Sequence, residues 1–317
     1  MLKKEFYFPS SDGQTQIHVI QWFPEAGVKA VLQISHGMVE YIDRYDEFAR
    51  YLAERGFCVV GHDHLGHGKS VQSQEYLGYF HEEKGNQYVI SDIHRLRKMT
   101  EKEYPGVPYF MMGHSMGSFL LRQYLTMRAE GLAGAIVMGT GDMPYALLKA
   151  GQAVCKSISL TKGWHHRSHL VNQLGMGGYN RQFEPSDSTK DWITSDDSKR
   201  KEYEADPLCN FVFTVNGYYQ MFEGMKVLTR RHAMDKIPVE LPVIFVSGAE
   251  DPVGSNGVGV TRVFRKYEAH GMTDVEMKLY AGDRHEILNE LNHLDVFGDV
   301  SRWLEAHLSK KQPGESA

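Results

Sequence analysis

Short apolar runs alternate with amphipathic segments along most of the chain, and this alternation predicts strands separated by helices. Strands are expected in the runs 30–37, 57–68, 109–113, 134–141, 241–252 and 275–286, and the second of these runs ends in a Gly/His loop. Helices are expected at 45–56, 88–104, 117–131, 260–271 and 296–308, where apolar residues recur every three or four positions. Because strands alternating with helices at this spacing are typical of βαβ units, we predict an α/β fold with a mostly parallel, doubly wound sheet.

Two parts of the chain depart from this alternation. Residues 5–23 hold two β-rich runs around the turn signal Ser11-Asp12-Gly13, which predicts an N-terminal pair of strands. Between residues 142 and 237 no run resembles the flanking strands, and polar residues, His, Met and Gly become more frequent. We therefore expect a core made of residues 1–141 and 238–317, with a mostly helical cap at 142–237 inserted between two strands of the sheet.

Composition narrows the class of protein. Hydrophobic residues make up 42% of the 317 residues and charged residues 24%, as in ordinary globular proteins. The formal net charge of −5 argues against a nucleic-acid partner, because phosphate contacts need a basic face. Cys58, Cys155 and Cys209 are too few and too widely spaced for a disulfide framework or a zinc pattern, so we expect them to be buried. Neither a secretory leader nor a membrane span is evident, so a cytoplasmic location with at most peripheral membrane contact is expected.

The chemistry of the chain centres on Gly113-His114-Ser115-Met116-Gly117, which fits the pattern G-x-S-x-G between an apolar strand and a helix. A serine in a sharp turn needs small neighbours, because larger side chains would clash with the strand and the helix. Such a turn presents the hydroxyl at the carboxyl end of the sheet, where a helix N-terminus favours developing negative charge. Ser115 is therefore our candidate nucleophile.

A serine nucleophile needs a base, and the base needs a carboxylate that orients it. Asp251 follows the apolar strand at 241–250, and His285 follows the next strand at 275–283. Both positions are carboxyl ends of strands, where sites in open α/β sheets are built. The order serine, acid, histidine is that of hydrolases with a strand-turn-helix nucleophile, so Ser115, Asp251 and His285 form the expected triad.

Other histidines and acids fit these roles less well. Four early histidines precede the serine, which is the wrong order for the base: His36, His62, His64 and His67. His293 falls within the last predicted helix. Glu250 is expected to point to the opposite side of an extended segment from Asp251, and Asp283 is too near His285 in sequence to orient it. For the oxyanion hole we expect the backbone N–H groups of Met38 and Met116.

Several segments together resemble the monoacylglycerol lipase and lysophospholipase branch of the α/β-hydrolases. They are His36-Gly37, GHDHLGHGKS at 61–70, GHSMG at 113–117, SGAEDPVG at 247–254 and AGDRHE at 281–286. The loop D-x-x-G-H-G-x-S of that branch is matched by Asp63, Gly66, His67, Gly68 and Ser70. The resemblance covers about two-thirds of the chain, and residues 191–218 also resemble the cap of bacterial lysophospholipase-like hydrolases.

One residue departs from the pattern of that branch. Its oxyanion loop often reads H-G-x-x-E-H, whereas this chain reads HGMVEY, with Tyr41 in the last position. The strand end itself is intact, but the hydrogen bonds around the loop and the placement of the substrate are expected to differ.

The cap is expected to help bind the substrate. Leu147, Leu148 and Val154 share one side of a predicted helix, and 211–225 is unusually aromatic. This pattern fits an apolar acyl tunnel and fits ordinary packing of a small cap equally well. The residues that we expect to contact the substrate are His36, Gly37, His114, Leu147 and Leu148.

Charged groups of the cap allow further interpretations. His165, His166 and His169 have a spacing that could bind metal, but no carboxylate accompanies them, so a polar surface is favoured and no metal site is expected. Arg167, Arg181 and the run 199–201 could meet anionic head groups, although a solvated face is the default interpretation.

The resemblance and the triad together predict a serine carboxylic-ester hydrolase of the α/β-hydrolase fold with a helical cap and without a cofactor. Its expected substrates are monoacylglycerols or lysophospholipids, with short-chain or aryl esters as the alternative. An iminopeptidase would need acidic cap residues to hold a substrate amine, for which Glu184, Glu202 and Glu204 are available. A binding protein on a hydrolase scaffold would be expected to have a broken triad.

Overall fold

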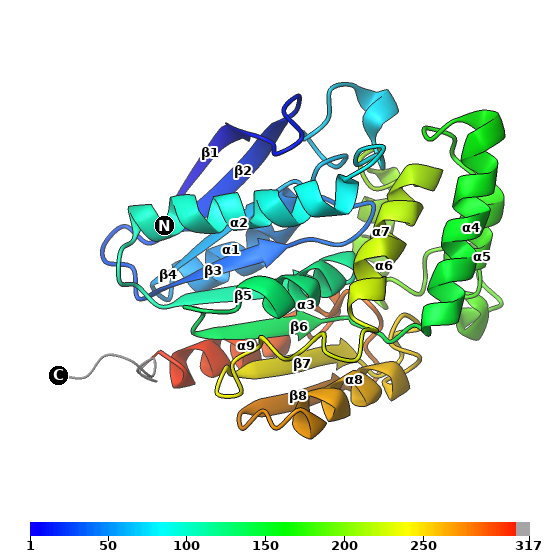
Figure 1. Ribbon diagram of the computed structural model, residues 1–317. Helices are drawn as coiled ribbons and strands as arrows, with labels where there is room; N and C mark the ends of the chain where they lie inside the picture. Colours follow the sequence, from blue (N-terminus) through cyan, green and yellow to red (C-terminus); the bar gives the residue numbers. More distant parts are fainter. Residues whose placement is uncertain (309–317) are drawn as a thin grey trace.

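One eight-stranded sheet runs through the centre of the computed structural model, which describes residues 1–308 (Figure 1). The strand order is β1-β2-β4-β3-β5-β6-β7-β8, in which β2 is antiparallel to both of its neighbours and β3 to β8 are parallel. The strands are β1 (Leu2–Pro9), β2 (Gln16–Phe23), β3 (Ala30–Ser35), β4 (Phe57–His62), β5 (Tyr109–His114), β6 (Gly134–Met138), β7 (Val243–Gly248) and β8 (Val275–Tyr280).

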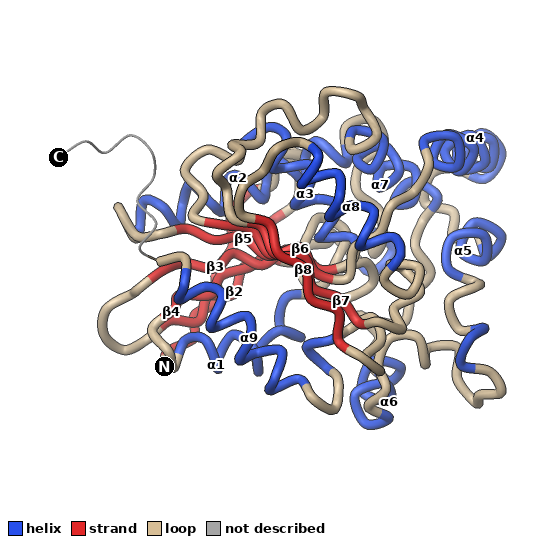
Figure 2. The backbone as a smooth tube through the Cα atoms, turned by 90° about the horizontal axis from the view of Figure 1, so that it is seen from below, coloured by secondary structure: helices blue, strands red, loops and turns tan. Residues whose placement is uncertain are grey.

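Helices cover both faces of this sheet. Figure 2 shows α2, α3 and α8 on one face and α1 and α9 on the other. Their bounds are α1 (Asp46–Ala53), α2 (Gly85–Glu103), α3 (Met116–Arg128), α8 (Val258–Ala269) and α9 (His293–Ala306). Short 3₁₀ helices are η1 (Ile42–Tyr45), η2 (Gln74–Tyr76), η3 (Arg181–Phe183) and η4 (Ile287–Asn289). The doubly wound α/β architecture and the N-terminal strand pair predicted from the sequence are confirmed.

The segment between β6 and β7 forms four helices and, within the described residues, no strand. They are α4 (Tyr145–Lys162), α5 (His169–Met176), α6 (Asp197–Ala205) and α7 (Val215–Val227). They stand beyond one end of the sheet, where α7 contacts α2 and α3 and α4 packs against α7 (Figure 1). We propose residues 142–237 as the cap, with its limits in the connections to β6 and β7.

Strands β3 to β7 are buried on both faces, which explains why they read as continuous apolar runs. The edge strand β8 instead alternates between exposed and less exposed positions. The run 57–68 forms β4 as far as His62 and then the expected Gly/His loop, which the Asp63 carboxylate holds in place. This carboxylate accepts the backbone N–H groups of Ile42 at 2.9 Å and Lys69 at 2.8 Å. The matched motif D-x-x-G-H-G-x-S therefore shapes this loop.

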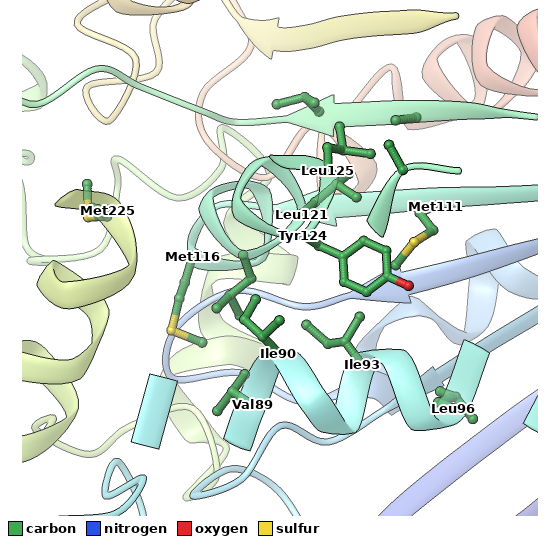
Figure 3. Packing of buried hydrophobic residues seen from close by; sticks show 14 of the residues in the cluster. Val89, Ile90, Ile93, Leu96, Met111, Met116, Leu121, Tyr124, Leu125 and Met225 are labelled. Carbon is green, nitrogen blue, oxygen red and sulfur yellow. The ribbon is translucent and has the colours of Figure 1, made fainter. Parts of the chain in front are cut away.

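Two apolar clusters, one on each face of the sheet, hold the layers together. In the larger one, Ile90 and Ile93 of α2 face Leu121 and Tyr124 of α3 (Figure 3). Cys58, Cys155 and Cys209 are buried and unpaired, as expected. Within residues 1–308, no helix is both long and apolar enough to cross a membrane.

Truncation of a side chain in this cluster should destabilise the fold. Ile93 is 0% exposed, so Ile93→Ala should lower the free energy of unfolding by about 2–5 kcal/mol through lost burial and a residual cavity. Met99 on the same helix is 38% exposed, and Met99→Ala should change it by less than about 1 kcal/mol. Urea unfolding of both variants measures the difference, and equal losses would contradict this assignment of the buried face.

Candidate active site

Ser115 occupies the turn between β5 and α3, with φ 53° and ψ −121°. Positive φ at a residue other than glycine costs on the order of 1–3 kcal/mol, so the surrounding structure must hold it in place. The N–H of Ser115 donates to the carbonyl of Met138 in β6 at 3.0 Å, and its own carbonyl accepts from Ser118 Oγ at 2.6 Å. The turn is thus pinned to the neighbouring strand and to the first turn of α3.

The two glycines of the motif are required by close packing. A Cβ atom on Gly117 would lie 2.0 Å from the carbonyl oxygen of Ser35 at the end of β3. A Cβ atom on Gly113 would lie 2.2 Å from the carbonyl oxygen of Gly117. Neither glycine has a positive φ, so the missing side chain, not backbone freedom, is what the turn needs.

Asp251 and His285 lie together beside this turn. Asp251 is 0% exposed, and its Oδ1 lies 3.0 Å from Nδ1 of His285, although the ring N–H is not aligned on that oxygen. The same Oδ1 accepts the N–H of Val253 at 2.9 Å, and Oδ2 accepts from Ser247 Oγ at 3.2 Å. These bonds fix the carboxylate in its strand-end turn. His285 lines the same cavity as Ser115, and Asp251 lies behind His285.

The competing groups lie in other surroundings. His293 begins α9, and its Nε2 lies 3.1 Å from Glu47. Glu250 is exposed. Asp283 is buried, and burial raises its pKa to about 6, but its Oδ2 has no hydrogen-bond partner.

The loop after β3 has the geometry expected of an oxyanion loop. Val39 adopts φ 57°, which is strained for a β-branched residue, and its carbonyl accepts from the Tyr203 hydroxyl of α6 at 3.0 Å. The N–H of Gly37 donates to Glu40 Oε1 at 2.5 Å. Within residues 1–308 the N–H groups of Met38 and Met116 have no hydrogen-bond partner, and both residues line the same cavity as Ser115. These amides are therefore free to bind a ligand oxygen.

The buried Glu40 carboxylate organises this loop. It accepts from Gly37, from Arg44 Nη1 at 3.0 Å, from the Tyr45 hydroxyl at 3.0 Å and from His114 Nδ1 at 3.1 Å. Burial alone would raise the pKa of Glu40, but the bond to His114 and the charge of Arg44 hold it well below its usual range. Burial opposes a charge on His114 as well, yet the Glu40 carboxylate raises the His114 pKa.

Arg44 extends this network to the residue next to His285. Its guanidinium donates two hydrogen bonds to Glu286, both at 2.7 Å. His114 Nε2 lies 3.2 Å from the carbonyl oxygen of His285, and the two rings are 4.7 Å apart. Tyr41, the departure from the family pattern, donates to Asp206 beyond α6 at 2.7 Å. The oxyanion loop is thus joined both to the His285 loop and to the cap.

A segment of the cap, residues 191–194, lies directly on the His285 loop. The N–H of His285 donates to the carbonyl of Trp192 at 3.3 Å, and that of Glu286 donates to Ile193 at 2.7 Å. The indole of Trp192 lies over the imidazole of His285, with ring centroids 5.1 Å apart. Nothing in the sequence singled out this contact, since it joins positions about ninety residues apart in a region without a motif.

Ser115 opens into a cavity of about 480 Å³ beneath the cap, a volume typical of ligand sites. Its apolar wall comes from α4, α5 and α7 and includes Leu147, Val154, Leu174, Met221, Phe222 and Met225. Gly37, His114 and Leu147 line it as expected. Two other expected substrate contacts, Leu148 and His36, do not line this cavity. Leu148 is buried in the core, and the ring of His36 binds the Gly37 carbonyl and the His64 N–H behind the loop.

His36 belongs to a cluster of four fully buried histidines beneath the oxyanion loop, together with His62, His64 and His67. Burial lowers the pKa of all four rings, to about 3 for His62 and His67. The cluster is therefore neutral at pH 7, and its rings contact one another and nearby backbone groups through uncharged hydrogen bonds. His165 of the cap, once a metal candidate, stacks on Tyr79 at 3.9 Å.

This cluster should make the protein sensitive to acid. Unfolded histidines take up a proton near pH 6.5, whereas folded His62 and His67 stay neutral to about pH 3. The stabilisation is full above about pH 6.5 and is lost as the pH falls toward 3, at up to about 1.4 kcal/mol per pH unit and histidine. His67→Leu should reduce this slope in urea unfolding between pH 7 and 5, whereas His232→Leu at an exposed site should not. Equal slopes would contradict the burial effect.

Comparisons with known proteins bear on the family and the fold of this chain. The family described as serine aminopeptidase, S33, matches residues 26–292. The chain is 26% identical over 299 residues to monoglyceride lipase of Homo sapiens, covering 93% of this chain and 88% of that protein. It is 25% identical over 291 residues to monoacylglycerol lipase of Mycolicibacterium smegmatis, covering 90% and 92%. A highly thermostable carboxyl esterase from Bacillus coagulans, solved in complex with glycerol, has a TM-score of 0.89 and 29% identity, covering 97% of this chain and 99% of that one. The chain belongs to the serine aminopeptidase S33 family, and its fold is the α/β-hydrolase fold.

Proposed function

We propose that the protein is a serine ester hydrolase that cleaves monoacylglycerols with Ser115 as nucleophile. The observation that carries this proposal is the meeting of Ser115, His285 and two unpaired backbone N–H groups at the wall of one largely apolar cavity. The names of the related human and mycobacterial lipases, and the glycerol in the related esterase, point to the same substrate class.

The reaction follows from the roles of these groups. His285 takes the proton of Ser115 as the hydroxyl oxygen attacks the ester carbonyl, and Asp251 holds the imidazole and stabilises its positive charge. The N–H groups of Met38 and Met116 stabilise the tetrahedral oxyanion. The C–O bond then breaks, and His285 gives its proton to the departing alcohol. Water, activated by the same histidine, releases the fatty acid from the acyl-serine.

The charges around the cavity argue against an aminopeptidase reaction. Three carboxylates line the cavity, but Glu40 and Glu286 bind Arg44, and Asp142 binds Lys266 at 2.9 Å. The acidic cap residues that could have held a substrate amine do not line it: Glu184, Glu202 and Glu204. No free carboxylate among the described lining residues is therefore available for a cationic substrate.

Removal of the nucleophile tests the assignment. Ser115→Ala should lower hydrolysis of a monoacylglycerol by about 10⁴-fold or more and abolish labelling by a fluorophosphonate probe, while the thermal melting curve is retained. Ser157→Ala, at an exposed position of α4, is the matched control and should keep full activity. Undiminished turnover of Ser115→Ala would overturn the proposed reaction.

Acyl chain length tests the apolar cavity separately from the triad. Each methylene that enters the cavity contributes about 0.8 kcal/mol, or about fourfold in kcat/KM. We therefore expect kcat/KM for p-nitrophenyl esters to rise steeply from acetyl to octanoyl and to level off when the cavity is filled. A sharp optimum at acetyl or butyryl would favour a short-chain esterase and contradict the lipid substrate.

A further inference from the structure

Lys190 places a positive charge in the wall of the reactive cavity. Within residues 1–308, it is the one lysine or arginine that lines this cavity. Its ammonium makes no hydrogen bond or ion pair with the described residues, but lies 5.8 Å from the ring centroid of Tyr203. The nitrogen is not enclosed, because it is not among the buried, unpaired polar atoms, and Lys190 lines both the reactive cavity and a depression outside it. A partly buried cation without a partner is stabilised by an anion that enters beside it.

The carboxylate that acts on Lys190 is itself bound to other groups. Burial lowers the pKa of Lys190, against the opposing influence of Glu204. The Glu204 carboxylate is itself engaged by Arg200 at 2.9 Å and by Ser188 Oγ. Arg200, one of the cationic cap residues noted in the sequence, is thereby occupied by acidic neighbours, whereas Lys190 is free for a ligand.

Asn172 of α5 supplies a second donor on the same part of the wall. The Tyr218 hydroxyl donates to its Oδ1 at 2.9 Å, which leaves the two N–H groups of the amide for a ligand. Asn172 and Lys190 both line the reactive cavity, and both also line a polar depression on the outside of the cap. They therefore lie where the cavity approaches the surface, a place suited to a polar head group.

The position of Trp192 connects this part of the cavity wall with the catalytic histidine. In acyl transfer, the departing alcohol takes its proton from the catalytic histidine and must lie beside it. Trp192 covers the ring of His285 and lines the cavity two residues after Lys190. The apolar wall from α4 and α7 remains for the acyl chain.

We propose that Lys190 and Asn172 form an anion-binding subsite for the leaving alcohol, so that the enzyme prefers monoacyl esters of a phosphate-bearing glycerol. The inference rests on the proposed ester hydrolysis and names the alcohol that it favours. In this reaction the carboxylic ester C–O bond breaks, His285 protonates the glycerol oxygen, and the phosphate stays intact on the released alcohol. The ammonium and the amide bind the phosphate oxygens through charge-assisted hydrogen bonds.

The test compares 1-lauroyl-glycerol 3-phosphate with 1-lauroyl-glycerol, both below their critical micelle concentrations. The wild-type protein should have the higher kcat/KM with the phosphate ester. Lys190→Met should lower the ratio of the two kcat/KM values by about 10- to 100-fold, and Lys190→Arg should restore most of it. Lys156→Met, an exposed cap lysine outside the cavity, is the matched control and should leave the ratio unchanged.

Inhibition separates a head-group site from a site for free phosphate. Glycerol 3-phosphate should inhibit hydrolysis of p-nitrophenyl octanoate competitively, and the inhibition should weaken about 10-fold in Lys190→Met. Equal inhibition by inorganic phosphate, or an unchanged substrate ratio in Lys190→Met, would overturn the proposal. A wild-type enzyme that cleaves only the neutral ester would overturn it as well, while the ester hydrolase itself would stand. Ser115→Ala should abolish hydrolysis of both esters, which tests the proposed reaction. The ratio of the two kcat/KM values in Lys190→Met tests the subsite separately.

Discussion

The buried carboxylate of Glu40 is the interaction on which the candidate site depends most. It binds the first N–H group of the oxyanion loop, the guanidinium of Arg44 and the ring of His114 at once. Arg44 in turn binds Glu286, next to His285. Removing one member of such a buried network leaves the others uncompensated, at a cost of about 3–5 kcal/mol. The loops that follow β3, β5 and β8 therefore hold one another in position.

The cap takes part in this arrangement from above. Tyr203 binds the strained oxyanion loop at Val39, and Trp192 covers the ring of His285. The same segment of the cap carries Lys190 toward the cavity, while α4, α5 and α7 supply its apolar wall. One inserted unit thus encloses the proposed nucleophile, supports the proposed base and divides the cavity into an apolar part and a cationic part. The placement of Lys190 in the wall is the basis of the proposed preference for an anionic head group.

Much of the fold was predictable, because the hydrophobic pattern reflects burial directly. Strands β3 to β7 are enclosed on both faces and read as unbroken apolar runs. In the helices between them, apolar residues recur every three or four positions. The Gly/His loop after β4 was predictable, but not the bond that Asp63 accepts there from Ile42, which lies twenty-one positions earlier. Leu148 was expected in the cavity because the sequence predicted the apolar side of its helix. The sequence did not predict that Leu148 on this side packs into the core.

By itself, the sequence determined the doubly wound sheet, the turn at Ser115 and the order of Asp251 and His285, because each of these is encoded by local residue type and strand-end position. The tertiary structure decided which distant groups meet: Trp192 with His285, Arg44 with Glu286, and Lys190 with the reactive cavity. These contacts join segments far apart in the chain, and several of them come from a cap without sequence motifs. Local pattern carries no information about such pairs, since only the packing of the cap on the sheet brings them within a few ångströms.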